Sequence, residues 1–260
     1  MTLDAALTQR LRELAGGPAP LLVASDLDGT LAAIVPRPED ARVPPTTLTA
    51  LARLATVAHV AIVTGRDLAT ARVLAPVTGV EFVASHGHEA SFVASTLPDA
   101  AADLSKRLEG LAGDIEARFA GTALRVERKA RSVAFHYRAD PSLAAPLREA
   151  LRELPEGLRL QPGRLVLEVL PAGGGKDTAL AALVERFRPG SILVLGDDLT
   201  DVAMFEAAGA SGGHALVLAV AGGSETPPEV VTAADAVVDQ GQVGEVLALL
   251  VDALAGPPPA

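Results

Sequence analysis

The residues best suited to chemistry are two aspartates one residue apart, Asp26 and Asp28, followed directly by Gly29. At this spacing one carboxylate can attack an electrophile while the other moves protons. Gly29 lets the chain turn sharply, so both side chains and a backbone carbonyl could converge on a cation. An ordinary Asp-Gly turn is the structural alternative, whereas a calcium loop would need its glycine at the sixth position instead of the fourth. The motif favours catalysis beside a metal.

A second acidic motif, Gly196 to Asp201, carries three carboxylates within five residues. In a half-buried crevice they would repel one another unless a cation or hydrogen bonds compensate. Mg²⁺ suits such hard oxygen ligands, because it binds through a few carboxylates while keeping waters and substrate phosphate. An acidic helix N-terminus, favoured by the helix dipole, explains the segment equally well when it is taken alone.

Two other segments could hold a phosphate. Thr64 to Arg66 offers a hydroxyl and backbone amides ahead of a predicted helix, although Thr and Gly are also ordinary cap and turn residues. Lys176 is one of three lysines in the chain and ends a glycine run, where its ammonium could offset charge that builds up during phosphoryl transfer. The run is not a P-loop, because Leu170 and Asp177 stand where that motif has Gly and Ser or Thr.

The elements that must position these motifs follow from the spacing of apolar residues, since short apolar runs alternate with segments of helical periodicity. The expected strands are Leu21–Ser25, His59–Thr64, Glu81–Ser85, Ile192–Gly196 and Ala215–Val220. The expected helices are Thr47–Val57, Leu68–Leu74, Thr178–Phe187, Asp201–Ala208 and Val243–Ala253. This alternation predicts an α/β fold, with a Rossmann-like parallel sheet core and helices on both faces. Each motif lies at the carboxyl end of a strand or the start of a helix, where open α/β sheets bind ligands.

The middle of the chain alternates apolar with polar residues, the period of half-exposed antiparallel strands. The expected strands are Leu124–Arg128, Ser132–Tyr137, Leu158–Gln161 and Leu165–Leu170. Two helical stretches, about Ala100 to Phe119 and Ser142 to Leu154, precede the two strand pairs. This order predicts an inserted α+β cap domain over residues 94–171, between core segments 1–93 and 172–260.

The chain has 260 residues, a formal net charge of −10 and no cysteine. The acidic balance disfavours nucleic-acid partners, which are bound through clustered Lys and Arg. Without cysteine, disulfides, thiolate metal sites and cysteine nucleophiles are excluded, and a reducing compartment is favoured. The segment from Met1 to Gly16 has an amphipathic helical pattern unlike a signal peptide, and no run approaches the roughly 20 apolar residues of a membrane span. We therefore expect a cytoplasmic protein with no nucleic-acid or membrane partner. We also expect a monomer, although none of these features bears on the oligomeric state.

Taken together, the four motifs resemble those of haloacid dehalogenase superfamily phosphatases and come in the same order over nearly the whole chain. The resemblance implies that Asp26 attacks phosphorus and that Asp28 moves protons in both steps of an aspartyl-phosphate mechanism. Mg²⁺ would be held by Asp26, the backbone carbonyl of Asp28 and Asp197, and two further aspartates would order its waters. The implied catalytic residues are Asp26, Asp28, Thr64 and Lys176, and the implied metal-site residues are Asp26, Asp28, Asp197, Asp198 and Asp201.

Three further segments resemble trehalose-phosphate phosphatases. They are the first motif with Pro36 soon after it, Ser85 to Glu89, and His136 to Arg138 on a predicted cap strand. The fourth motif, Gly-Asp-Asp-Leu-Thr-Asp, fits the same family. The resemblance implies Mg²⁺-dependent hydrolysis of trehalose 6-phosphate, a small sugar phosphate, as part of trehalose biosynthesis. The implied substrate-binding residues are Gly65, Arg66, His86, Glu89, Arg164 and Glu168.

The sequence departs from the family pattern at two positions and leaves two alternatives open. Val202 stands where the family usually has Glu, and His88 stands where an apolar residue is more usual. A related phosphatase acting on sucrose phosphate, mannosyl phosphoglycerate or a hexose phosphate would share every catalytic residue. A non-catalytic sugar-phosphate sensor is the other alternative, although a binder has no need of the nucleophile and proton carrier that Asp26 and Asp28 would supply.

Overall fold

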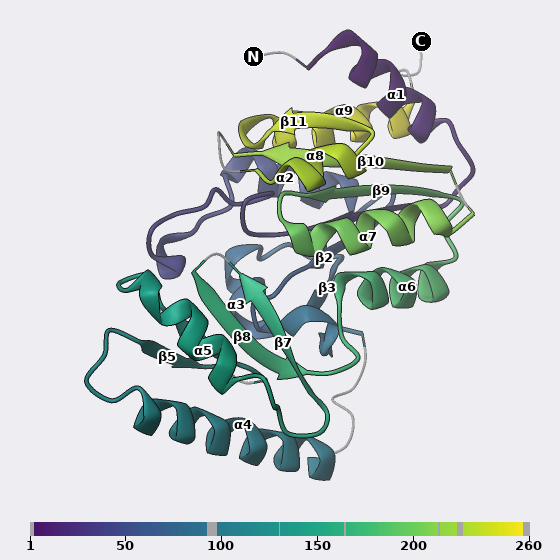
Figure 1. Cartoon of the computed structure of the whole chain (residues 1–260). Coiled ribbons are helices and arrows are strands. Elements are labelled where there is room, and N and C mark those ends of the chain that lie inside the picture. The colour runs from purple at the N-terminus through teal and green to yellow at the C-terminus, as the bar shows by residue number, and fades with distance from the viewer. Residues whose placement is uncertain are drawn as a thin grey trace. The chain divides into compact units, whose positions relative to one another are not determined.

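The computed structural model describes residues 3–92, 98–129, 131–163, 165–212, 214–222 and 226–256 (Figure 1). The chain divides into two compact units. The core unit comprises Met1–Phe92 and Gly175–Ala260, and the inserted unit comprises Val93–Gly174. None of the described helices combines the length and the apolar character that crossing a bilayer requires.

A seven-stranded sheet forms the centre of the core unit, in the order β11-β10-β9-β1-β2-β3-β4. Its strands are β1 (Leu21–Ser25), β2 (His59–Val63), β3 (Val80–Ala84), β4 (Glu89–Ala90), β9 (Ser191–Gly196), β10 (His214–Ala221) and β11 (Ala236–Asp239). Neighbouring strands are parallel except for β3 and β4, which pair antiparallel. In the central pair Ser25 lies opposite Leu195, and the amide of Asp26 donates to the Leu195 carbonyl at 2.9 Å. The two acidic motifs therefore leave the sheet side by side.

Helices cover both faces of this sheet, as Figure 1 shows. One face packs against α1 (Ala5–Ala15), α2 (Pro45–Leu54), α3 (Leu68–Leu74) and α9 (Val243–Ala255). The other packs against α6 (Lys176–Phe187), α7 (Leu199–Ala210) and α8 (Pro228–Ala233). Within β1, Leu21 and Val23 join the first core, whereas Leu22 and Ala24 join the second. Because both faces are covered, the strand is a continuous apolar run instead of an alternating one.

The inserted unit is a four-stranded antiparallel sheet with two helices on one face. Its elements are α4 (Pro98–Arg118), β5 (Arg125–Arg128), β6 (Val133–His136), α5 (Ala144–Ala150), β7 (Leu158–Gly163) and β8 (Val166–Pro171). The strand order is β5-β6-β8-β7. Phe135 and Leu167 lie opposite each other and pack with Ile115 and Leu147 of the helices. Glu127 and Glu168, each opposite Ala134 of β6, lie on the other face.

The predicted α/β class, with a parallel sheet and an α+β insertion, is confirmed. The sequence patterns do not predict β4, β11 or α8, because these elements are only two, four and six residues long and show too little periodicity. The stretch predicted as one helix from Ser142 to Leu154 is a 3₁₀ turn, Pro141–Leu143, followed by α5. Asp140 caps that turn by accepting from the amide of Ser142 at 3.1 Å, which separates it from the preceding strand.

Candidate active site

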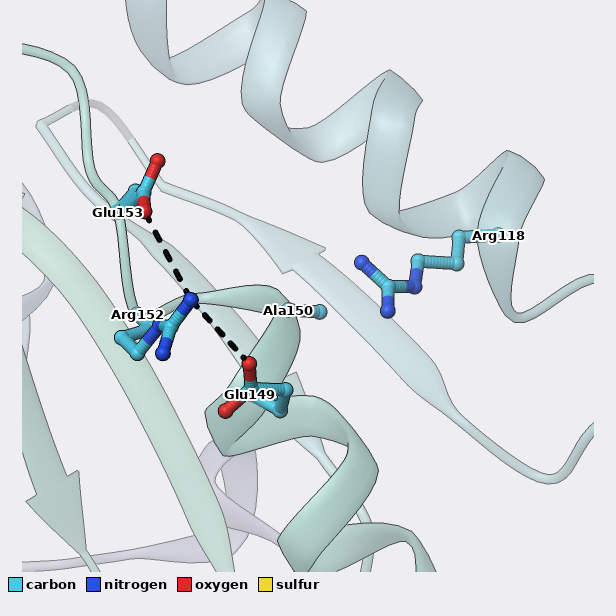
Figure 2. A pocket seen from close by; sticks show the side chains of 5 residues that line it. All are labelled: Arg118, Glu149, Ala150, Arg152 and Glu153. Carbon is cyan, nitrogen blue, oxygen red and sulfur yellow. Dashed lines mark ion pairs between the residues drawn. The ribbon is translucent and has the colours of Figure 1, made fainter.

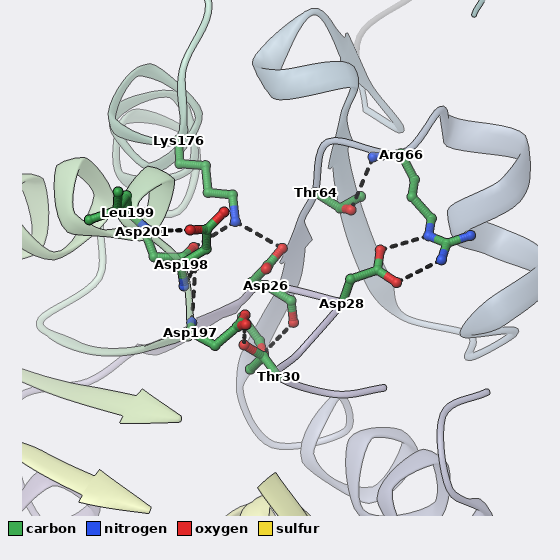
Figure 3. A network of polar contacts seen from close by, with 11 residues as sticks. Asp26, Asp28, Thr30, Thr64, Arg66, Lys176, Asp197, Asp198, Leu199 and Asp201 are labelled. Carbon is green, nitrogen blue, oxygen red and sulfur yellow. Dashed lines mark hydrogen bonds and ion pairs between the residues drawn. The ribbon is translucent and has the colours of Figure 1, made fainter. Parts of the chain in front are cut away.

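Three buried carboxylates and one lysine meet at the carboxyl ends of β1 and β9 (Figure 3). Lys176 Nζ lies 2.9 Å from Asp26 Oδ1 and 2.6 Å from Asp201 Oδ1. Asp26, Asp197 and Asp201 each offer one oxygen, and these oxygens all lie within 4.8 Å of one another. We call these four residues the acidic cluster. A single ammonium group faces three carboxylates, so the cluster keeps an excess of negative charge whenever all of them are ionised.

Two glycines make room for the cluster. A Cβ atom at Gly29 would lie 1.9 Å from Asp197 Oδ2, and the φ of +84° at Gly29 also disfavours any side chain. A Cβ atom at Gly196 would lie 2.3 Å from Asp201 Cγ. Thr30, which is fully buried, donates its hydroxyl to Asp197 Oδ1 at 3.1 Å. Gly29 is thus required by the close approach of a carboxylate from the other acidic motif, and Gly196 by that of Asp201 within its own motif.

Burial governs the protonation of the cluster. Burial raises the pKa of Asp26 well above its ordinary value, although Lys176 opposes this shift. Burial and the neighbouring Asp201 raise the pKa of Asp197 to about 7. Burial alone would lower the pKa of Lys176, but Asp201 and Asp26 more than offset this, so the pKa is raised and the ammonium stays charged. A cation bound among the carboxylates would favour their ionised forms.

The donor set fits a hard divalent cation, because it consists of carboxylate oxygens, two from residues that follow β1 and β9 and one from the first turn of α7. Asp26 and Asp197 are the carboxylates best placed to hold it. Asp201 is anchored more heavily, since its Oδ1 accepts from Lys176 and its Oδ2 accepts from the amides of Asp197 and Asp198 at 3.1 and 3.0 Å. The acidic cluster can therefore bind a metal ion.

Two residues of the predicted metal site place their side chains outside the acidic cluster. Asp198 is exposed, and its carboxylate accepts from the amide of Leu199 at 2.6 Å, which caps the start of α7. The carboxylate of Asp28 is directed toward Arg66 (Figure 3). The predicted contributions of these residues, through ordered waters and a backbone carbonyl, stay predictions.

Arg66 and Asp28 form a two-point ion pair. Arg66 Nε lies 2.6 Å from Asp28 Oδ2, and Nη2 lies 2.6 Å from Oδ1. The Nη2 group also donates to the carbonyl of Pro38 at 3.0 Å. The sequence places Arg66 among the substrate-binding residues, whereas the structure places its guanidinium on the residue predicted to be the acid and base.

Thr64, at the end of β2, is joined to a strained turn that begins at Ser85. The Thr64 carbonyl accepts from the amide of His86 at 3.2 Å, and the Arg66 carbonyl accepts from the amide of Ser85 at 2.7 Å. Ser85 and His86 have φ values of 49° and 55°, in the left-handed region. Such residues cost of order 1 kcal/mol each and are retained where the surrounding structure holds them. The His86 ring covers Gly65, where a Cβ atom would lie 2.5 Å from the ring Cε1.

Glu89 ties this turn to α3. Its Oε1 accepts from the Ser85 hydroxyl at 2.8 Å, and its Oε2 accepts from the amide of Leu68 at 3.3 Å. Leu68 is the first residue of α3, where backbone amides lack partners within the helix. Glu89 therefore has a role in the fold, and its predicted sugar contact stays a prediction.

In the inserted unit, the sheet face opposite the helices carries paired polar groups. Lys129 Nζ lies 2.9 Å from Glu168 Oε1, which also accepts from the hydroxyl of Ser132. His136 and Glu127 pair at 2.7 Å. Sequence reasoning misses Lys129, although its rarity as one of three lysines is a usable signal. The remaining predicted sugar-binding residue, Arg164, lies outside the described residues.

A surface pocket of the inserted unit provides a contrast (Figure 2). Its lining consists of Arg118, Glu149, Ala150, Arg152 and Glu153. Arg152 lies 3.5 Å from Glu149 and 3.7 Å from Glu153, and all three side chains are largely exposed. None of the described site residues predicted from the sequence lines it, so the acidic cluster is the candidate active site.

Comparisons with known proteins agree with this location. The sequence model of the trehalose-phosphatase family matches residues 24–227, a range that contains the whole acidic cluster. The chain is 33% identical over 204 residues to trehalose-6-phosphate phosphatase of Escherichia coli K12, covering 74% of each chain. It is 36% identical over 223 residues to an uncharacterized glycosyl hydrolase of Mycobacterium tuberculosis, covering 76% of this chain but spanning only 16% of that protein. A crystal structure of Aspergillus fumigatus trehalose-6-phosphate phosphatase aligns with a TM-score of 0.68 at 26% identity, covering 96% of this chain and 98% of the other.

Proposed function

Because the chain belongs to the trehalose-phosphatase family, we propose that it hydrolyses trehalose 6-phosphate to trehalose and inorganic phosphate. The observation that carries the proposal is the buried acidic cluster, in which Lys176 lies 2.9 Å from Asp26. Burying several carboxylates is costly in free energy, so a cluster of this kind indicates cation binding or chemistry. A phosphatase with a carboxylate nucleophile uses them for both purposes.

In the first step a carboxylate oxygen of Asp26 attacks phosphorus. The new bond joins Asp26 to the phosphoryl group, the bond from phosphorus to the sugar oxygen breaks, and Asp28 gives that oxygen a proton. Lys176 and Thr64 hold phosphoryl oxygens and offset their charge, since this chemistry depends mainly on positioning and electrostatics. Lys176 is suited to the role because its ammonium stays charged although its side chain is only 4% exposed.

In the second step water hydrolyses the aspartyl phosphate. Asp28 takes a proton from the water, the water oxygen bonds to phosphorus, and the bond to Asp26 breaks, which restores the free carboxylate. Mg²⁺, when held by Asp26 and Asp197, would reduce the repulsion between a carboxylate and a phosphate dianion. Thr30 supports this arrangement by fixing Asp197 through its hydroxyl.

The sugar is expected to contact Glu168 and Glu89, because a carboxylate can accept several hydroxyl hydrogen bonds. Glu168 has a side chain that is only 12% exposed and is oriented by Lys129, so it offers a fixed acceptor instead of a mobile one. Replacing Glu168 by Gln should raise the KM for trehalose 6-phosphate about tenfold and leave the KM for p-nitrophenyl phosphate unchanged. Glu149→Gln, an exposed change in the same unit, is the control and should alter neither value.

The decisive test is phosphate release by purified protein from a panel of esters, with Mg²⁺ and with a chelator. We expect the highest kcat/KM for trehalose 6-phosphate and loss of turnover in the chelator. A higher kcat/KM for glucose 6-phosphate, sucrose phosphate or a mannosyl phosphoglycerate would show that trehalose 6-phosphate is not the preferred substrate. If both wild type and Asp26→Asn bind trehalose 6-phosphate without turnover, the protein is a sugar-phosphate sensor and not an enzyme.

A further inference from the structure

We propose that Arg66 is a positioning residue, which orients Asp28 for proton transfer to the leaving sugar oxygen and does not bind the phosphate itself. The inference deepens the proposed function and rests on it. It starts from the ion pair in which Arg66 Nε and Nη2 lie 2.6 Å from the two carboxylate oxygens of Asp28.

This pair restrains Asp28 more strongly than a single contact would. Two parallel hydrogen bonds fix the plane of the carboxylate as well as its distance, which is the particular property of an arginine fork. The Asp28 side chain is 38% exposed, so few other contacts limit its rotation. Without Arg66 the carboxylate would sample several side-chain orientations.

Arg66 is itself held on three sides, so it can serve as a fixed support. Its Nη2 donates to the Pro38 carbonyl at 3.0 Å, and its backbone amide donates to Thr64 Oγ1 at 3.2 Å. Its carbonyl accepts from the amide of Ser85 at 2.7 Å. The Arg66 side chain is only 16% exposed. The Pro38 contact ties the guanidinium to the segment after β1, and the backbone contacts tie Arg66 to Thr64 and to the strained turn after β3.

The same contacts argue against a direct phosphate contact. A guanidinium can bind a phosphate with two hydrogen bonds through its Nε–Nη2 edge or its Nη1–Nη2 edge. Asp28 occupies the first edge, and Nη2, which both edges share, donates to Asp28 and to the Pro38 carbonyl. A phosphate ligand would have to displace bonds that Arg66 already makes. The cation beside the nucleophile is Lys176, at 2.9 Å from Asp26, and Figure 3 shows the Asp26 carboxylate directed to Lys176 while that of Asp28 is directed to Arg66.

A positioning role makes a specific kinetic prediction. A sugar alkoxide is a poor leaving group and needs a proton as it departs, whereas p-nitrophenolate departs without one. Misplacing a catalytic group by about 1 Å can cost on the order of 100-fold in rate. Loss of Arg66 should therefore slow the first step far more with trehalose 6-phosphate than with p-nitrophenyl phosphate, whereas the second step is common to both esters.

The experiment is a double-mutant cycle with Arg66→Ala, Asp28→Asn and the double variant, each assayed on both esters. We expect Arg66→Ala to lower kcat/KM, which reports formation of the aspartyl phosphate, by roughly 30- to 100-fold for trehalose 6-phosphate and by less than about 3-fold for p-nitrophenyl phosphate. Neither KM should rise more than about 2-fold above wild type, because no substrate contact is lost. In the Asp28→Asn background, Arg66→Ala should have no further effect, because Arg66 acts through Asp28. Arg66→Lys, which keeps the charge without the fork, should restore only part of the loss.

The control is Arg53→Ala, which removes a surface ion pair with Asp252 at 2.8 Å in the same unit and should leave both reactions unchanged. Effects that multiply in the double variant, or KM values that rise for both esters, would show that Arg66 binds phosphate and would overturn the inference alone. Equal loss of kcat/KM on both esters would overturn it in favour of a structural role. A wild-type protein that hydrolyses neither ester would overturn the proposed function and the inference with it.

Discussion

The acidic cluster of the core unit and an ion cluster on the inserted unit are built from the same kinds of residue. In the inserted unit Arg128 lies 3.0 Å from Glu109 and 2.7 Å from Glu116. In the core unit Lys176 lies 2.9 Å from Asp26 and 2.6 Å from Asp201. Contact distances therefore do not distinguish a group of surface ion pairs from a functional site.

Burial separates the two clusters. The Arg128, Glu109 and Glu116 side chains are 38%, 61% and 43% exposed, so water and salt screen their charges. The Lys176 side chain is 4% exposed and that of Asp201 is fully buried. Buried charges keep their desolvation cost, and well-packed apolar residues in their place would often leave the fold equally or more stable. The comparison teaches that a group of buried charges, which carries a large desolvation cost, indicates chemistry. A group of exposed charges, which carries little such cost, does not.

The largest expected effect comes from the nucleophile. Asp26→Asn removes the attacking carboxylate, and we expect kcat for phosphate release to fall at least about 1,000-fold while the fold is kept. Asp103→Asn, which removes a surface carboxylate paired with Arg107 at 2.6 Å, should keep wild-type activity. Phosphate release and far-ultraviolet circular dichroism would measure the two outcomes. More than a tenth of wild-type turnover in Asp26→Asn would contradict the assignment of this cluster as the catalytic one.

The next effect is on stability. Lys176→Met leaves buried carboxylates without their ammonium partner, and we expect a loss of about 3 kcal/mol in the free energy of unfolding. Arg128→Met removes a cation with equally short contacts on the surface and should give no measurable loss. Urea denaturation of both variants at neutral pH is the measurement. If the two variants lost equal free energy of unfolding, burial would not distinguish the two clusters.

A smaller effect tests the packing around the carboxylates that we propose hold the metal. Gly29→Ala would place a methyl group 1.9 Å from Asp197 Oδ2, so Asp197 must move. We expect the Mg²⁺ concentration for half-maximal activity to rise at least about 10-fold, the order seen when groups that orient metal ligands are disturbed. Gly110→Ala in α4, where a Cβ atom meets nothing within 4 Å, is the matched control and should leave the Mg²⁺ requirement unchanged. An unchanged requirement in Gly29→Ala would remove Asp197 from the metal site.

The smallest effect is a pH dependence of the metal-free protein. Because the pKa of Asp197 is raised to about 7 from an ordinary value of 3.8, its stabilising contribution is complete below pH 4 and is lost as the pH rises toward 7. Stability in a chelator should therefore fall between pH 5 and pH 7, by at most about 1.4 kcal/mol per pH unit for this group. Urea midpoints should show a shallower fall in Asp197→Asn and in wild type with Mg²⁺. Parallel curves for wild type and Asp197→Asn would contradict the shift.

Much of the fold follows from local patterns. The apolar runs before Asp26 and Asp197 predict strands that the structure contains as β1 and β9, and the ends of those strands predict where acidic side chains gather. These features are readable because periodicity and strand-end motifs depend on neighbouring residues. Short elements such as β4 and α8 lack enough residues for a pattern.

Contacts between distant residues are harder to read. The sequence indicates that Arg66 and Asp28 are both important, but it does not pair them. It indicates a turn at Gly29, but not that Asp197 Oδ2 occupies the space where a side chain would be. Such contacts depend on strand register and loop path, which set the positions of side chains far apart in the chain.

By itself, the sequence determined the α/β class, the order of the motifs and the kinds of group available for phosphoryl transfer. Only the tertiary structure decided that Asp201 anchors Lys176, that Arg66 supports Asp28, and that Glu89 ties a turn to α3. The physical reason is that composition and periodicity follow from covalent neighbours, whereas burial and hydrogen-bond partners follow from which segments the folded sheet brings side by side.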